Sequence, residues 1–308
     1  MVSKLEINII HNADNRITQS VIKKERNFLL FFSDICVLFD VDATKLRECP
    51  SLKSRQFDKI IFNFPHAGGK MKIERNRDLL KDFFVSSESM IKENGQILVT
   101  LCNGQGGTPM DEPRRRWDDS WKIVEMAAHG NFILTRIEPF LWQSFRNYIV
   151  TGYRSLDKQF HTAGSLTHFF TKGKLPMMHN IAPSNKIHTF KYTVDNITWK
   201  NMIKNIQDKL DVKCIHPCSF IFDLTLSTDR NFNTANFYQS LYNYAGSIID
   251  NVDLINCYHS PVDEKIKRTY RINYKSNYMP LYRRRVIELH QNVIANFVED
   301  KFKVTVSR

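Results

Sequence analysis

Short apolar runs alternate with amphipathic segments over the first half of the chain. The runs, which read as buried strands, are residues 5–10, 59–64 and 96–101, and apolar positions recur at helical spacing over 17–29 and 75–91. Strands that alternate with helices, each strand apolar on both faces, are typical of a parallel sheet covered by helices on both sides. The pattern therefore predicts an α/β domain over residues 1–171.

The end of this domain has a different pattern. Residues 132–140 and 147–155 read as two strands joined only by the short segment LWQSFR, which leaves no room for a crossover helix. We therefore expect these two strands to pair antiparallel. A parallel sheet closed by an antiparallel pair is, by analogy of fold, the usual shape of S-adenosylmethionine-dependent methyltransferases.

The second half begins with a change of composition. Residues 172–213, which open with a stretch rich in Lys, Pro, Asn and Met, read as a linker region. From residue 219 the pattern gives strand, helix, strand, strand, helix, strand, with the first helix starting near Asn233. This is the order of the ferredoxin-like fold. The predicted class is an α/β Rossmann-like methyltransferase domain followed by an α+β ferredoxin-like domain over 214–308.

Composition and charge indicate a class of binding partner. The 308 residues are 42% hydrophobic and 25% charged, as in ordinary globular proteins, and 44 Lys and Arg against 32 Asp and Glu give a net charge of +12. The count is 24 basic and 20 acidic residues over 1–171, and 20 and 12 over 172–308. The second half therefore carries +8 of the +12, which favours a polyanionic partner such as RNA.

Several classes of protein are not indicated. The six cysteines are scattered, and the one close pair, Cys214 and Cys218, lacks a second pair at zinc-ligand spacing. No stretch of about 18 apolar residues predicts a membrane span, and residues 1–15 resemble neither a secretory nor a transit peptide. We therefore expect a soluble intracellular protein with no metal site and no membrane partner.

Three segments follow predicted strands and should border one crevice at the carboxyl edge of the sheet: 40–44, 63–69 and 103–107. Asp42 has two interpretations. Its carboxylate could accept a hydrogen bond from the amino group of a bound adenine, beside the backbone amide of Ala43. Alternatively, Asp42 caps the helix that follows it, because Asp and Thr both satisfy free amides at a helix start.

The run FNFPHAGG contains the second of these segments, and its sequence is too unusual for a generic turn. Asn63, Pro65 and His66 could grip a planar base or the polar edge of a cofactor, because an amide presents both a donor and an acceptor. His66 is either a general base or, as is commoner beside a glycine turn, a structural residue. The third segment, NGQGG, lacks the spacing and the Lys of a phosphate-binding loop.

Basic residues interleaved with aromatic ones mark two further segments. Arg114, Arg115 and Arg116 beside Trp117 and Trp121 suit a nucleic-acid backbone with stacked bases, or else form a solvated helix start whose tryptophans enter the core. In the second domain the cations of this kind are Arg268, Arg271, Lys275, Arg283, Arg284 and Arg285, next to Tyr270, Tyr274 and Tyr278. These residues form a candidate RNA surface, or a charged sheet face that binds only protein.

Three runs, VDATKL at 41–46, FDKIIFNFPHAGGK at 57–70 and the later NGQILVTLCNGQ, resemble a family of eukaryotic methyltransferases that modify a uridine N3 in large-subunit ribosomal RNA. Residues 214–308, with YRINYKS and ELHQNVIANF, resemble the ferredoxin-fold anticodon-binding domain of phenylalanyl-tRNA synthetases. The resemblance implies S-adenosyl-L-methionine as cofactor and rRNA or tRNA as partner, in the cytoplasm or nucleolus.

The resemblance also implies roles for residues. Asn63, Pro65 and His66 would be catalytic, and Asp14, Asp42, Ala43 and Asn63 would bind the cofactor. One departure from the family matters, because its domain begins with a strand that runs into a glycine-rich turn, and residues 1–60 contain no glycine. We therefore expect a domain that starts at the family's second strand, and a noncatalytic RNA-binding adaptor is the alternative to an enzyme.

Overall fold

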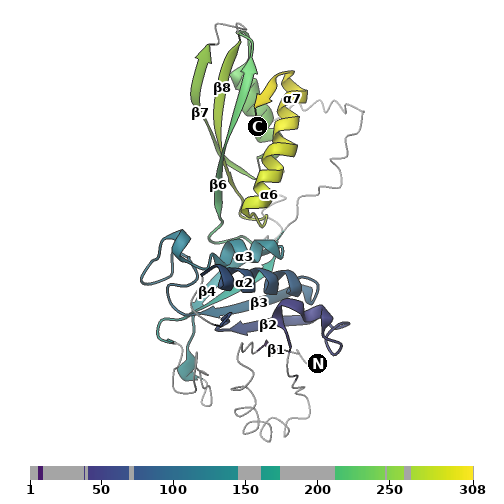
Figure 1. Ribbon diagram of the computed structural model, residues 1–308, viewed down its shortest axis with the longest axis vertical. Helices are drawn as coiled ribbons and strands as arrows, with labels where there is room; N and C mark the ends of the chain where they lie inside the picture. Colours follow the sequence, from purple (N-terminus) through teal and green to yellow (C-terminus); the bar gives the residue numbers. More distant parts are fainter. Residues whose placement is uncertain are drawn as a thin grey trace, which may run out of the picture.

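The computed structural model describes residues 6–9, 38, 41–68, 73–144, 161–173, 212–246, 248–259 and 265–307. Three predictions fall outside these residues: the helix over 17–29, the strand over 147–155 and most of the linker region, together with the candidate residue Asp14. The described chain forms two sheets, one above the other in Figure 1.

The first sheet has five strands in the order β1-β2-β3-β5-β4. Its strands are β1 (Glu6–Ile9), β2 (Phe57–Asn63), β3 (Ile91–Leu101), β4 (Phe132–Pro139) and β5 (Leu166–Lys172). β1, β2 and β3 are parallel, and β5 pairs antiparallel with both β3 and β4. The expected mixed sheet is confirmed, whereas the expected pairing of 132–140 with 147–155 falls outside the described residues. Among those residues β4 pairs with β5, a strand that the hydrophobic pattern did not single out.

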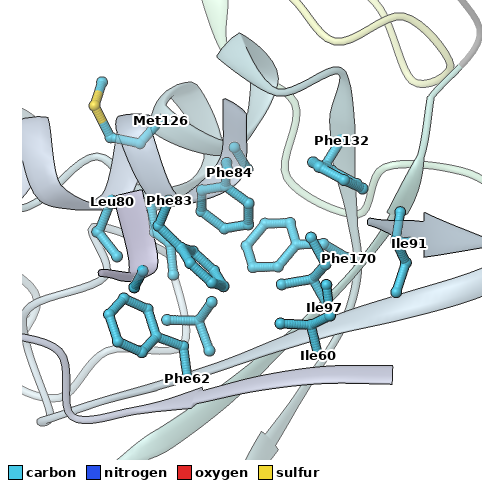
Figure 2. Close-up of a cluster of buried hydrophobic side chains, with 14 of the residues drawn as sticks. Ile60, Phe62, Leu80, Phe83, Phe84, Ile91, Ile97, Met126, Phe132 and Phe170 are labelled. Carbon is cyan, nitrogen blue, oxygen red and sulfur yellow. The ribbon is translucent and has the colours of Figure 1, made fainter. Parts of the chain in front are cut away.

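α2 (Ile73–Ser87) and α3 (Ile123–His129) cover one face of this sheet in the described part of the chain (Figure 1). The same part of the chain also forms the short helices η1 (Ala43–Glu48), η2 (Trp117–Asp119) and η3 (Trp142–Ser144). Figure 2 shows Phe83 and Phe84 of α2 packed against Phe62 of β2 and Phe170 of β5. All four rings are fully buried, so burial of aromatic surface holds α2 onto the sheet.

β3 begins earlier than the sequence indicates. Residues 91–95 also belong to the strand, and β3 holds four residues, 92–95, where β2 has only Asp58. Gly95 permits this irregularity, because a Cβ there would lie 2.9 Å from the backbone oxygen of Asp58. α2 ends at Ser87, and Met90 and Ile91, expected in the helix, are buried beyond it.

The second sheet has the order β7-β8-β6-β9, with every neighbouring pair antiparallel. Its elements are β6 (Ser219–Thr228), α5 (Thr234–Ala245), β7 (Ile249–His259), β8 (Ile266–Lys275), α6 (Arg283–Glu288), the π-helical η5 (Leu289–Ile294), α7 (Ala295–Phe302) and β9 (Thr305–Ser307). Asn233 caps α5, since its side chain accepts a hydrogen bond from the Asn236 amide. The ferredoxin-like order is confirmed.

The two sheets are joined by direct contacts. The Ile215 amide donates to the Leu134 carbonyl of β4 at 2.9 Å, and the Cys214 amide donates to the Asn277 carbonyl at 2.7 Å. Cys214 itself is buried in the core of the first sheet. The His129 ring at the end of α3 stacks on Tyr282, with ring centroids 3.9 Å apart. These contacts fix the second sheet above α3.

Candidate functional site

The loop after β2 is held from two sides. Asn63 ends the strand, and its Oδ1 accepts a 2.7 Å hydrogen bond from the Thr100 hydroxyl of β3. The next residue, Phe64, has a left-handed backbone with φ of +47° and is buried. Its amide donates to the Thr100 carbonyl. The loop therefore leaves the sheet at a fixed, strained angle, as backbone at functional sites often does.

α2 holds the other end of this loop. The Asn76 side chain, 2% exposed, accepts a 3.0 Å hydrogen bond from the Ala67 amide. Nδ1 of His66 accepts a 2.8 Å hydrogen bond from the Gly68 amide. A neutral imidazole that accepts at Nδ1 carries its proton at Nε2, so His66 presents a donor and not a base. Sequence reasoning missed Asn76, although a polar residue on the apolar face of a helix could have signalled it.

Thr100 orders a short chain of hydrogen bonds behind Asn63. The Thr100 hydroxyl has one hydrogen and donates it to Asn63, so the hydroxyl of Thr167 on β5, 3.0 Å away, must donate to Thr100. With Oδ1 occupied in this way, the amide N–H groups are the donors of the Asn63 side chain. Asn63 and His66 both belong to the loop after β2, where the sequence predicts a crevice.

Asp42 lies at the start of η1, a segment that contacts the C-terminal end of α2. Its Oδ1 accepts hydrogen bonds from the amide and the hydroxyl of Thr44, at 2.9 and 2.7 Å, and so caps η1. η1 is tied to α2 through Ser86, whose hydroxyl accepts from the Leu46 amide. Ser86 and Asn76 are separated by about 15 Å along a helix. The helix-cap interpretation of Asp42 is therefore confirmed, whereas the adenine interpretation stays a prediction. Ala43 is buried beside it.

The loop after β3 is built around a buried carboxylate. Asp111, 2% exposed, accepts hydrogen bonds from the amides of Gly104 and Thr108. Gly104 and Gly107 both have φ of +78°, so the glycines of NGQGG serve these turns. Trp121 enters the core at 3% exposure, its ring 6.3 Å from the His66 ring, whereas Trp117 remains 38% exposed.

His168 of β5 is an ionisable group beneath this loop that the sequence did not single out. It is fully buried, its Nδ1 lies 3.3 Å from the Val99 carbonyl, and its Nε2 has no hydrogen-bond partner within the described part of the chain. Burial lowers the pKa of His168 to about 4. Gly106 packs against this ring, because a Cβ there would lie 2.8 Å from Nε2.

This histidine predicts a loss of stability in mild acid. Between the usual pKa of 6.5 and about 4 the unfolded chain binds a proton at His168 that the folded chain does not, so stability falls as the pH is lowered. The loss approaches about 3 kcal/mol. Urea unfolding at pH 7 and pH 5 should show this slope in the wild type and a shallower one in His168→Gln. His161→Gln, at an exposed residue near β5, should keep the wild-type slope, and equal slopes for both variants would contradict the assignment.

The candidate RNA-binding cations do not form one patch. Arg271 makes two 2.9 Å hydrogen bonds to Asp223 on the open face of the second sheet. Arg268 contacts Thr228 and lies over the Phe232 ring. Arg285 donates to Asn131 of the first domain at 2.8 Å, so it serves the contact between domains.

The remaining candidate residues lie in different surroundings. Lys275 is 4.0 Å from Asp250, and Arg284 pairs with Glu288 on the surface. The Arg283 guanidinium lies over the Phe222 ring at 5.4 Å. Tyr270 and Tyr274 are fully buried, so the expectation that these tyrosines accompany the cations on an exposed face is wrong. They fill the core because their strand turns its even-numbered residues toward the helices.

Within the described residues, no helix is long and apolar enough to cross a membrane. No group of three or more His, Cys, Asp or Glu side chains in that part of the chain is arranged to hold a metal ion.

Comparison with known proteins finds a family that matches the first domain and several proteins that are similar to about half of the chain. Residues 11–152 match the family described as rRNA (uridine-N3-)-methyltransferase BTM5-like. The human protein named ferredoxin-fold anticodon-binding domain-containing protein 1 is 44% identical over 161 residues, which is 51% of this chain and 26% of that protein. Its mouse homolog is 48% identical over 136 residues, 44% of this chain and 22% of the homolog. The chain thus spans about a quarter of these relatives.

Solved structures give weaker likenesses. An S-adenosylmethionine-dependent methyltransferase from Clostridium acetobutylicum aligns with a TM-score of 0.32 at 11% identity, over 56% of this chain and 76% of that one. At this score the likeness adds nothing to the sheet topology described above. The sequence matches confirm the resemblance: residues 11–152 match the BMT5-like family of rRNA (uridine-N3-)-methyltransferases, and the chain is similar to ferredoxin-fold anticodon-binding domain-containing protein 1.

Proposed function

We propose that this chain acts on RNA and that the loop after β2 holds a uridine whose N3 receives a methyl group from S-adenosylmethionine. The observation that carries the proposal is the loop after β2, which holds Asn63 and His66 and is fixed by Thr100 and Asn76. The match of residues 11–152 to uridine-N3 methyltransferases supports the choice of base and atom.

The chemistry of uracil explains why donors suit this site. N3 lies between the carbonyls at C2 and C4, and when it loses its proton the negative charge spreads onto both oxygens. N–H groups of Asn63 and His66, aimed at those oxygens, would lower the free energy of the uracil anion. N3 would lose its proton to water and would gain the methyl group through the freed electron pair, while the electrons of the broken S–CH3 bond would stay on the cofactor's sulfur, which would leave as S-adenosylhomocysteine. A base in a duplex would first have to leave the stack.

The cofactor would supply the electrophilic methyl group, and part of the chain fits it. Asp42 supplies a carboxylate at the start of η1, and a carboxylate is an acceptor suited to the amino group of an adenine. By resemblance, Asp42 and Ala43 would hold the adenine, with Asn63 at the reacting end and Asp14 as a further ligand outside the described residues. The close backbone approach of a glycine-rich turn has no counterpart in residues 1–60.

Asp42→Ser separates the two roles of Asp42. Serine caps helices as well as aspartate does, so the melting temperature should stay close to that of the wild type. The charged acceptor is lost, so the affinity for S-adenosylmethionine measured by calorimetry should fall about 10-fold to 100-fold. Thr44→Val removes the hydroxyl bond but keeps the carboxylate and should bind almost as the wild type does. Unchanged affinity in Asp42→Ser would leave Asp42 as a cap only.

A second candidate function is a noncatalytic RNA-binding adaptor. The engagement of Asp42 in a helix cap favours it. As an adaptor, the chain would bind RNA but would not bind S-adenosylmethionine. Calorimetry with the cofactor alone and with RNA alone therefore separates the two candidates.

A further inference from the structure

A cleft of 430 Å³ lies where the two domains meet. The loop after β3 supplies one wall, with Arg114 and Trp117, and residues 215–220 with Lys275 supply the other. The volume is within the range of pockets that hold small organic ligands, roughly 300–1,000 Å³. This cleft is separate from the contacts of Asn63 and His66, which are on the loop after β2.

The charges of the cleft favour an anion. Its ionisable lining side chains are Arg114, His216, Cys218 and Lys275, and none of its twelve lining residues is an aspartate or glutamate. Two carboxylates act on lining residues from outside the cleft: Asp250 lies 4.0 Å from Lys275, and Glu125, which acts on Cys218, accepts a hydrogen bond from the Arg283 amide. The walls of the cleft therefore carry cations and no carboxylate, which favours an anionic ligand.

Trp117 provides a flat surface on the cleft wall. It is 38% exposed, although the neighbouring Trp121 is almost fully buried. Its segment is held in place, since the Arg77 guanidinium donates to the carbonyls of Asp118 and Ser120, at 2.7 Å for Asp118 and 2.6 Å for Ser120. The Ser120 hydroxyl donates to the Trp117 carbonyl at 2.8 Å. These bonds fix the backbone that carries the ring, and Lys122 Nζ lies 5.7 Å from the ring centroid. An aromatic ring on a fixed backbone binds a flat partner with less loss of entropy.

The opposite wall is fixed as well. The hydrogen bond from Ile215 to Leu134 anchors the start of residues 215–220, and the bond from Arg285 to Asn131 ties α6 to the first domain. The stacked pair of His129 and Tyr282 lies in the same contact. The width of the cleft is therefore set by the fold before any ligand arrives.

We propose that this cleft binds a single-stranded segment of RNA, with one base stacked on Trp117 and its phosphates near Arg114 and Lys275. A single strand combines phosphates with exposed base faces, which match the cations and the tryptophan. Bases in a duplex are already stacked on one another, so a duplex cannot present a base to this ring. The inference rests on the proposed function in taking RNA as the partner, and it adds a second contact point beyond the reacting uridine.

The test uses the full chain and a fluorescein-labelled ten-nucleotide oligouridylate, with binding followed by fluorescence anisotropy. Trp117→Ala should lower the affinity about tenfold, as loss of one stacked base does. Trp142→Ala is the matched control, because Trp142 is exposed to the same extent, 37%, and does not line the cleft. It should bind as the wild type does. Trp117→Phe keeps a stacking ring and should retain most of the affinity, which excludes misfolding as the cause of the loss.

Three results would overturn the proposal. They are equal affinity of Trp117→Ala and the wild type, equal losses in Trp117→Ala and Trp142→Ala, and no binding of oligouridylate by the wild type. A duplex of the same length bound through Trp117 as tightly as the single strand would also contradict it. Methylation of uridine is measured separately, so a failure of the cleft leaves the proposed reaction intact, and a failure of methylation leaves the cleft to be judged by anisotropy.

Discussion

Asn63→Asp is expected to lower the rate of uridine methylation about 100-fold to 1,000-fold while the affinity for RNA changes little. The substitution keeps the shape of the side chain and the oxygen that accepts the Thr100 hydroxyl. It replaces the N–H donors with a negative oxygen, next to the carbonyl where negative charge develops. Removing one such donor from an enzyme typically costs this much in rate. The measurement is initial-rate methyl transfer to ribosomal RNA at saturating RNA.

The control for this prediction lies near the amino end of β3, whereas Asn63 lies at the carboxyl end of β2. Asn94→Asp changes an exposed residue in the irregular first part of β3 and introduces the same charge. Its rate should equal that of the wild type. If both variants lose activity equally, then added charge and not the donor of Asn63 explains the loss.

Phe84→Ala is expected to destabilise the first domain by about 3–5 kcal/mol, the usual cost of removing a fully buried phenylalanine. Phe84 contacts the rings of Phe83, Phe132 and Phe170, with centroids 5.4, 5.9 and 4.9 Å away. Its truncation leaves a cavity between α2, β4 and β5 that these rigid neighbours cannot fill (Figure 2). Urea unfolding measures the change.

Val85→Ala is the matched control, because Val85 is the next residue of α2 and is 49% exposed. It should cost less than about 0.5 kcal/mol. A loss below about 1.5 kcal/mol in Phe84→Ala, or similar losses in both variants, would show that α2 does not pack on the sheet as described.

The hydrophobic pattern predicted most elements because burial and periodicity are linked. Tyr270, Ile272 and Tyr274 alternate along β8 and are all fully buried, as their spacing implies. The pattern could not say which of the two faces is covered, since helices distant in sequence decide that. For this reason the tyrosines, expected beside the cations, fill the core.

β5 shows a second limit of sequence reasoning. Its run LTHFFTK contains His168 and two threonines, so it does not look like a buried strand, yet His168 is fully buried and Thr167 is 8% exposed. Pairing with β3 and β4 on both sides satisfies the backbone of β5, although the side-chain atoms His168 Nε2 and Thr171 Oγ1 have no hydrogen-bond partner within the described residues. Only the tertiary structure shows this.

The candidate site was partly predictable. The residues of the loop after β2 were singled out by their composition, but the direction of their hydrogen bonds depends on Thr100 and Gly68 and changes His66 from a possible base into a donor. Arg285 was expected to bind RNA as part of an arginine run. Its bond to Asn131, 154 residues away in the sequence, could not be read from the run itself.

The central claim is that this chain methylates uridine at N3 through Asn63 and His66. The most direct measurement incubates the purified chain with S-adenosylmethionine and unmodified ribosomal RNA, digests the RNA to nucleosides and quantifies 3-methyluridine by mass spectrometry. We predict 3-methyluridine with the wild type and with Asn94→Asp, and almost none with Asn63→Asp. RNA that is bound but contains no 3-methyluridine at saturating cofactor would contradict the claim and leave the chain as an RNA-binding adaptor.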